Sequence, residues 1–266
     1  MPFLSTVAIS AVLIYASVSD IRRREVPDVC WAIICAIAVV DYSRYCPDGV
    51  LVSACFILIS LAILWERLDG WGGNVFLIIG LLGLFTDSIL LENPVPAVSS
   101  VMIIVMLALY HAGLIKGGAD VKSLIALSMA FPTYQITTLT VWVPEYPLAL
   151  IINPAFSILA LSLVMSMAGG IYVLCRSMGS ERISFVSFPM ALSDARSAHV
   201  WPAQDIVDGI LVDRIVYDDV QTAFDRLEES GLAQVRVTPM IPFIVPITAS
   251  FVIVALFGSP LMGAVI

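Results

Sequence analysis

The sequence predicts an all-α polytopic membrane protein with about eight transmembrane helices and a small cytoplasmic α+β insert before the last helix. Of the 266 residues, 60% are apolar and only 13% are charged, whereas about a quarter of the residues of a soluble domain are charged. The apolar residues gather in long runs, and a membrane-spanning helix needs about 20 of them. Many of the charged residues fall in one stretch, 176–238.

Eight apolar runs meet the length and composition of a membrane span. They lie near residues 3–20, 28–42, 49–65, 73–91, 97–115, 121–139, 147–175 and 240–262. The second run is short, and Pro132 interrupts the sixth. The first run has no basic residue before it and three arginines after it, the reverse of a secretory signal peptide. We therefore expect a retained helix whose N-terminus lies outside.

Basic residues predict the orientation of the whole chain in the cell membrane. With the N-terminus outside, only Arg44 falls in an outer loop, and the other basic residues that flank the spans fall on the cytoplasmic side. This distribution follows the positive-inside rule. The cytoplasmic residues are Arg22, Arg23, Arg24, Arg67, Lys116, Lys122 and Arg176.

The composition divides the chain into a transmembrane core (1–175), a cytoplasmic soluble insert (176–238) and a C-terminal transmembrane helix (239–266). Six arginines against ten acids leave the insert with a net charge of −4. The segment "DDVQTAFDRLEESGL" predicts an amphipathic helix that Asp219 caps and Gly231 ends. "ILVDRIVYD" and "AQVRVTP" predict strands, because they alternate or are rich in β-branched residues.

Charge and cysteine usage exclude two classes of function. The net charge of −8 argues against a nucleic-acid partner, since the only cluster of basic residues is the arginine triplet at 22–24. The five cysteines form no C-x-x-C pair and the two histidines are far apart, so we predict neither a metal site nor a disulfide framework. No cofactor is expected.

Two carboxylates at the ends of spans are the strongest candidates for chemistry. Ionisable residues at a membrane are costly and are functional candidates by default. Asp20 closes the first span and Asp120 opens the sixth, and the even number of spans between them puts both on the same side. Two carboxylates that converge in a partly dehydrated site can act as a general acid and base. The alternative is that Asp120 only caps its helix after a Gly-Gly turn.

Two short motifs resemble a known family. "DIRRREVPD" (20–28) resembles the D-x6-P element and "GGAD" (117–120) the G-x-x-D element of the type IV prepilin peptidases, in particular the archaeal preflagellin peptidases. These enzymes are related in mechanism to the presenilin-type G-x-G-D membrane aspartyl proteases. The resemblance implies that Asp20 and Asp120 are the catalytic dyad and that Gly117 and Gly118 belong to the motif, where they permit close approach of a substrate backbone.

The resemblance also implies a substrate: a pilin-like or flagellin-like precursor with a short basic leader before an apolar helix. Three further residues are candidate neighbours of the site, namely Lys116, Pro27 and Pro242. Lys116 has the alternative role of an interfacial lysine that extends toward water. Pro242 lies in "VTPMIPFIVPITAS" (237–250), where the family has a similar entry into its last helix; the alternative is that these prolines only shape that helix.

The chain departs from the family pattern at several positions. Ala119 replaces the second glycine of G-x-G-D, which fits the archaeal branch better than the presenilin branch. Asp28 follows Pro27 where the family often has Asn. The cysteine-rich cytoplasmic domain of many bacterial members is absent, and two more helices separate the motifs than in the shortest archaeal relatives.

Helix dipoles predict which aspartate carries the charge. Asp20 lies at the C-terminus of its predicted helix, where the dipole disfavours an anion, and Asp120 lies at an N-terminus, where the dipole favours one. We therefore expect Asp120 to be ionised and Asp20 to hold the proton.

Two other functions stay open at this point. A proton-coupled transporter or channel would also use membrane carboxylates, but it predicts acids near the bilayer midplane and an internal repeat. A non-enzymatic scaffold would use the 176–238 insert to bind a partner and would leave both aspartates replaceable.

Overall fold

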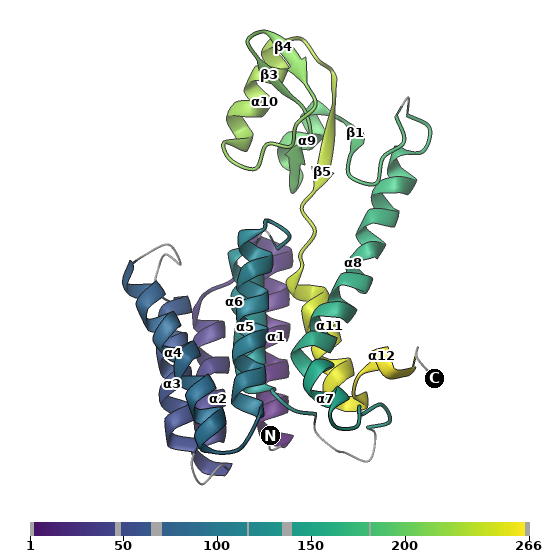
Figure 1. The fold of residues 1–266 in the computed structure, drawn as a ribbon. Coiled ribbons are helices and arrows are strands. Elements are labelled where there is room, and N and C mark those ends of the chain that lie inside the picture. The colour runs from purple at the N-terminus through teal and green to yellow at the C-terminus, as the bar shows by residue number, and fades with distance from the viewer. Residues whose placement is uncertain are drawn as a thin grey trace. The chain divides into compact units, whose positions relative to one another are not determined.

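The computed structural model describes residues 3–45, 49–64, 71–115, 117–134, 140–180 and 182–263. The chain is mostly helical and has a small region of sheet toward its C-terminus (Figure 1). It folds as two compact units. Unit 1 joins Met1–Leu163 to Pro242–Ile266, and unit 2 is Val164–Ile241.

The helices of unit 1 coincide with the predicted apolar runs. They are α1 (Phe3–Arg23), α2 (Val29–Tyr45), α3 (Gly49–Leu64), α4 (Trp71–Leu90), α5 (Val95–His111), α6 (Gly118–Ala130), α7 (Leu148–Ile151), the first part of α8 (Pro154–Ser177), α11 (Ile244–Phe257) and α12 (Pro260–Gly263). By length and composition, α1, α4 and α8 are able to cross a membrane, while α3, α5 and α11 are apolar but shorter.

Two of the predicted runs form helices that differ from the prediction. The sixth run ends as a helix at Ala130, because the α conformation is disfavoured for Phe131, the residue before Pro132; positions 135–139 lie outside the described residues. The seventh run is split into α7 and α8, and Asn153 Oδ1 accepts a hydrogen bond from the N–H of Phe156 at the start of α8 (2.9 Å). Each difference arises from one residue with a strong local preference.

The last apolar run is also broken, at Gly258. This glycine has a φ of +87°, which separates α11 from α12. A Cβ at this position would collide with the carbonyl oxygen of Trp142. The same oxygen accepts a hydrogen bond from the N–H of Ser259 (2.7 Å). The close approach of the 140–143 segment therefore requires glycine here.

Helix α6 is the centre of unit 1. It contacts α2, α5 and α11, and its residues are buried on every side, as is typical of a helix that is apolar all round. Helix α1 packs on α2 and α11. Hydroxyl groups join α1 to α11: Ser17 Oγ lies 2.7 Å from Thr248 Oγ1, which also donates to the carbonyl oxygen of Leu13 (3.2 Å). This packing brings the end of α1 toward the N-termini of α6 and α11.

Unit 2 contains the sheet, which was predicted only in part. Strands β1 (Phe188–Ala191), β5 (Gln234–Pro239) and β2 (Val200–Pro202) form an antiparallel sheet in the order β1-β5-β2, and β3 (Asp205–Val207) pairs with β4 (Ile210–Val212). Helices α9 (Leu192–Ser197) and α10 (Val220–Glu229) complete the unit. Buried apolar side chains on these elements form a core of their own, which includes Phe188, Phe224, Leu227, Val235 and Val237.

The predicted amphipathic helix is α10, and the predicted strand "AQVRVTP" is β5. In "ILVDRIVYD" only the first three residues form a strand, β4. Asp219 does hold the N-cap position of α10, but its side chain makes no capping hydrogen bond. Gly231 follows the helix with a φ of +78°, as its predicted role requires.

Candidate functional site

The structure brings Asp20 and Asp120 together, although they are 100 positions apart in the sequence. Asp20 lies in the last turn of α1 and Asp120 in the first turn of α6. Both side chains are half-buried, and they are close enough for the charge of Asp20 to act on Asp120. Like charges in such a pair cannot both form cheaply.

The first turn of α6 holds the side chain of Asp120. Gly117 is the N-cap residue, and its carbonyl oxygen accepts the N–H groups of Asp120 and Val121 (3.1 and 3.2 Å). The Asp120 carboxyl group folds back over Gly117, so a Cβ on Gly117 would collide with its Oδ2 atom. Around Gly118, in contrast, a Cβ would meet no atom within 4 Å. Of the two motif glycines, only Gly117 therefore lies against the Asp120 carboxyl group and leaves space for it.

A second helix N-terminus reaches Asp20 from far along the chain. The backbone of Ile244, the first residue of α11, hydrogen-bonds to the Asp20 side chain. Arg24 lies near enough to attract the same carboxylate. Backbone N–H groups at a helix N-terminus and a nearby cation both stabilise an anion.

These contacts argue against the expectation that Asp20 holds the proton. That expectation considered only the C-terminus of α1, because the position of α11 is not visible in the sequence around Asp20. Burial disfavours the anion of both residues, but Asp20 has the N-terminus of α11 and the charge of Arg24 beside it, and both favour its anion. Asp120 has the favourable end of its own helix but also faces the charge of Asp20.

A salt bridge joins the two motif segments. Lys122 Nζ lies 2.7 and 2.8 Å from the two carboxylate oxygens of Asp28. Asp28 directly precedes α2 and follows Pro27 of the first motif, while Lys122 is two residues beyond Asp120. The Lys122 side chain is 15% exposed and the Asp28 side chain 48%, so the lysine end of the pair is shielded from water while the carboxylate end is open to it. It fixes the start of α2 against the first turns of α6.

The remaining predicted site residues have different positions. Pro27 is exposed just before α2, where its carbonyl oxygen accepts the N–H of Cys30 (3.0 Å). Pro242 is half-buried two residues before Ile244, so the proline-containing segment does lead to the helix end that contacts Asp20. Lys116 lies outside the described residues.

Three features of the site were missed from the sequence: the Lys122 side chain, the Ile244 backbone and the inward position of Arg24. An acid and a base at the starts of two predicted spans on the same side of the membrane were a usable signal for the Asp28–Lys122 pair. A backbone contact carries no side-chain signal at all. Arg24 was grouped with Arg22 and Arg23 as a topology anchor.

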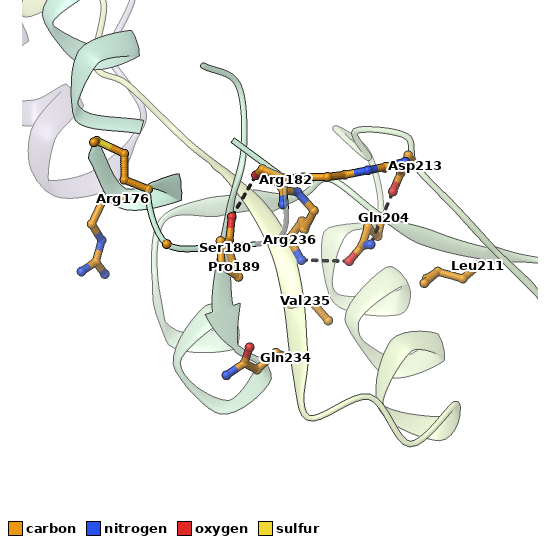
Figure 2. A pocket seen from close by; sticks show the side chains of 12 residues that line it. Arg176, Ser180, Arg182, Pro189, Gln204, Leu211, Asp213, Gln234, Val235 and Arg236 are labelled. Atoms are coloured by element: carbon orange, nitrogen blue, oxygen red, sulfur yellow. Dashed lines mark hydrogen bonds and ion pairs between the residues drawn. The ribbon is translucent and has the colours of Figure 1, made fainter. Parts of the chain in front are cut away.

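A separate groove of about 1000 Å³ lies in unit 2 (Figure 2). It is lined by residues of the last turn of α8, the segment after it, and strands β1, β4 and β5. Its three arginines are already engaged. Arg182 pairs with Asp213, Arg236 donates to the Oγ and carbonyl oxygen of Ser187 (3.1 and 2.8 Å), and the Arg176 guanidinium lies 5.4 Å from the Phe188 ring centroid. The three arginines of the groove therefore already have partners within unit 2.

Within the described ranges, no group of three or more His, Cys, Asp or Glu side chains lies close enough to hold a metal ion. The pair Asp20–Asp120 is thus the candidate site.

No protein-family model matches the sequence, and no curated protein does so either.

Proposed function

We propose that this protein is a membrane-embedded aspartic endopeptidase that removes the short basic leader from pilin-like or flagellin-like precursors at the cytoplasmic face of the membrane. The observation that supports it best is the meeting of Asp20 and Asp120, which come from distant motifs and interact electrostatically in the folded chain. Of the motif residues, Gly117 caps the helix that carries Asp120, and Pro27 precedes Asp28, whose side chain is paired with Lys122 of the same helix. The resemblance of the motifs supplies the substrate class.

The proposal includes a membrane location with about eight spans and the N-terminus outside. The surfaces of α1, α4 and α8 support it, because many large apolar side chains on these helices are exposed. Examples are Phe3, Ile14, Ile78, Leu82 and Val164. Exposed apolar area of this extent is unusual for a water-soluble monomer and is normal where lipid covers it.

The proposed chemistry uses the two aspartates in different roles. Asp20, whose anion the N-terminus of α11 and Arg24 favour, accepts a proton from a water molecule while the water oxygen bonds to the carbonyl carbon of the scissile peptide bond. Asp120, in its protonated form, donates its proton to the carbonyl oxygen. When the carbon–nitrogen bond breaks, the proton on Asp20 passes to the leaving amine and the proton on the former carbonyl oxygen returns to Asp120. Water is the only co-substrate that this cycle needs.

The test is cleavage by the purified full-length protein in detergent micelles. The substrate is a synthetic precursor with a lysine-rich and arginine-rich leader, followed by about 20 apolar residues. We expect Asp20→Asn and Asp120→Asn each to reduce the cleavage rate by at least about 10³-fold, because each removes one partner of general acid–base catalysis. Asp87→Asn is the matched control, since Asp87 is a buried acid of the same unit that lies on α4. Cleavage that survives either dyad substitution contradicts the proposal.

A proton-coupled transporter is the second candidate, and Asp87 is the observation that favours it. Its side chain is 5% exposed among apolar helices and is hydrogen-bonded by the Cys55 thiol (3.4 Å). The transporter requires Asp87→Asn to abolish proton uptake into vesicles that contain the protein. The endopeptidase requires the same variant to keep its cleavage activity, so one variant separates the two functions.

A further inference from the structure

The three arginines after the first span do not have equivalent surroundings. Arg22 and Arg23 are exposed, as expected for residues that only anchor a helix end. Arg24 is half-buried, and its Nε and Nη1 atoms are buried. Its backbone has a φ of +57°, which is uncommon for a residue with a side chain, and its N–H donates to the carbonyl oxygen of Asp20 (3.1 Å). This turn directs the chain back at Asp20 and places the Arg24 charge beside its carboxylate.

The buried Nε–H and Nη1–H groups of Arg24 have no hydrogen-bond acceptor among the residues that the structure describes. The great majority of buried hydrogen-bond donors in proteins have an acceptor. A buried charged donor without one is especially unfavourable. The attraction of Asp20 is electrostatic and leaves these two donors unused. An acceptor brought by a ligand would satisfy them at a position next to the dyad.

The proposed function, on which this inference rests, brings such an acceptor. A peptide bond is open to attack only where the helix around it is unwound, and unwinding leaves main-chain carbonyl oxygens without their helical partners. In an apolar environment each unpaired carbonyl group costs several kcal/mol, on the order of 2–7. Planar N–H groups of an arginine can bind such oxygens directly.

We propose that Arg24 is a substrate-binding residue whose Nε–H and Nη1–H groups, which lie on different edges of the guanidinium, donate to separate main-chain carbonyl oxygens of the unwound segment beside the scissile bond. The unpaired donors of Arg24 and the unpaired carbonyl oxygens of the substrate then become each other's hydrogen-bond partners. Arg22 and Arg23 have no part in this contact.

The variants separate hydrogen bonding from charge. Arg24→Gln removes both the guanidinium and its charge, and Arg24→Lys keeps the charge but removes the Nε–H and Nη1–H donors. Arg23→Gln removes an exposed charge one residue away and is the matched control. In micelles with the precursor peptide, we expect kcat/KM to fall about 10- to 100-fold for Arg24→Gln. Arg24→Lys should lie in between, and Arg23→Gln should stay within about twofold of the unmodified protein.

A change in the substrate identifies the bonded oxygen. Replacing one carbonyl oxygen at a time by sulfur, at positions flanking the scissile bond but not at it, weakens that acceptor. At the contacted position we expect kcat/KM to fall about 2- to 10-fold with the unmodified protein, and the same replacement to have no effect with Arg24→Gln or Arg24→Lys. A merely structural role of Arg24 would leave the effect of sulfur equal in all variants.

Several outcomes overturn the inference. The first is a sulfur effect that is the same in all variants at every flanking position, and the second is Arg24→Gln cleaving as fast as the unmodified protein. A third is an activity loss in Arg24→Gln that depends on the fraction of phosphatidylglycerol in the micelle, because Arg24 would then bind lipid phosphate. If the unmodified protein fails to cleave the precursor at all, the proposed function fails, and that result is distinct from the others.

Discussion

Gly117 and Gly118 are adjacent in the sequence but differ in what surrounds them. The carboxyl group of Asp120 occupies the space where a Gly117 side chain would begin, while the space beside Gly118 is open. Neither glycine has a left-handed backbone, so conformational strain does not separate them. At the scale of single residues, the glycine motif therefore acts chiefly through the space that Gly117 leaves for Asp120.

We expect Gly117→Ala to lower kcat by about tenfold or more at saturating precursor, because the new methyl group displaces the Asp120 carboxyl group from Asp20. The fold should be little affected, since the colliding atom is the end of a side chain that can rotate away. Gly118→Ala should keep kcat within about twofold. The measurement is steady-state cleavage with the thermal midpoint of each variant as a check on folding. Equal losses of kcat in both variants would contradict this account of the motif.

At the scale of elements, the site is an arrangement of helix ends. The C-terminus of α1 and the N-termini of α6 and α11 supply the groups around the two carboxylates. The N-terminus of α2 joins them through the bond between Asp28 and Lys122. A helix end leaves backbone groups without partners inside the helix. These groups are available to the two carboxylates, so the site forms where the helices end.

The pair Asp28–Lys122 should position α2 against α6. We expect Asp28→Lys to lower the cleavage rate about tenfold or more, because a second cation would then face Lys122, whose side chain is only 15% exposed. The double exchange, Asp28→Lys with Lys122→Asp, should recover most of that loss. The measurement is a double-mutant cycle on both the cleavage rate and the thermal midpoint, with an expected coupling of about 0.5–3 kcal/mol. Additive effects of the two changes would show that the pair does not position the helices.

Asp28→Asn gives a milder comparison at the same position. The amide oxygen still accepts a hydrogen bond from Lys122, and asparagine is the residue that the resembled family often has there. We expect a loss of no more than about threefold in the cleavage rate.

At the scale of the whole molecule, the negative charge of unit 2 is unevenly neutralised. Asp205 is 1% exposed and is held by Arg214 and Arg226 at 3.0 and 2.7 Å. Arg196 likewise pairs with Asp225 and Glu228. Among the described residues, five exposed acids of unit 2 have no salt bridge: Asp194, Asp208, Asp218, Asp219 and Glu229. These five carry charge that is free to act at long range.

We expect this charge to attract the basic leader of the precursor before cleavage. Since salt screens such attraction, kcat/KM should fall several-fold as the salt concentration rises from about 0.02 to 0.5 M. Changing the five acids to their amides should remove most of the salt dependence without altering kcat at saturation. A precursor with an uncharged leader is the control. A cleavage efficiency that is the same at low and high salt would refute a steering role for the insert.

Local patterns predicted the apolar helices well and their ends less well. The runs of apolar residues became helices α1 to α6, α8 and α11, because burial of long apolar runs dominates local preference. The ends at Ala130 and Phe257 were misplaced, since one proline and one glycine stopped helices whose hydropathy continued. Strands β1, β2 and β3 were not predicted, because three or four residues are too few to show an alternating pattern.

The sequence by itself determined the apolar helical character of the chain, the acidic segment and the two aspartates that stand at helix ends. Only the tertiary structure decided that α11 presents its N-terminus to Asp20, that Asp28 pairs with Lys122, and that Arg24 turns inward while Arg23 does not. The physical reason is the same in each case. These contacts join atoms of different helices, or depend on how one side chain packs, and such interactions arise only when distant segments of the chain meet.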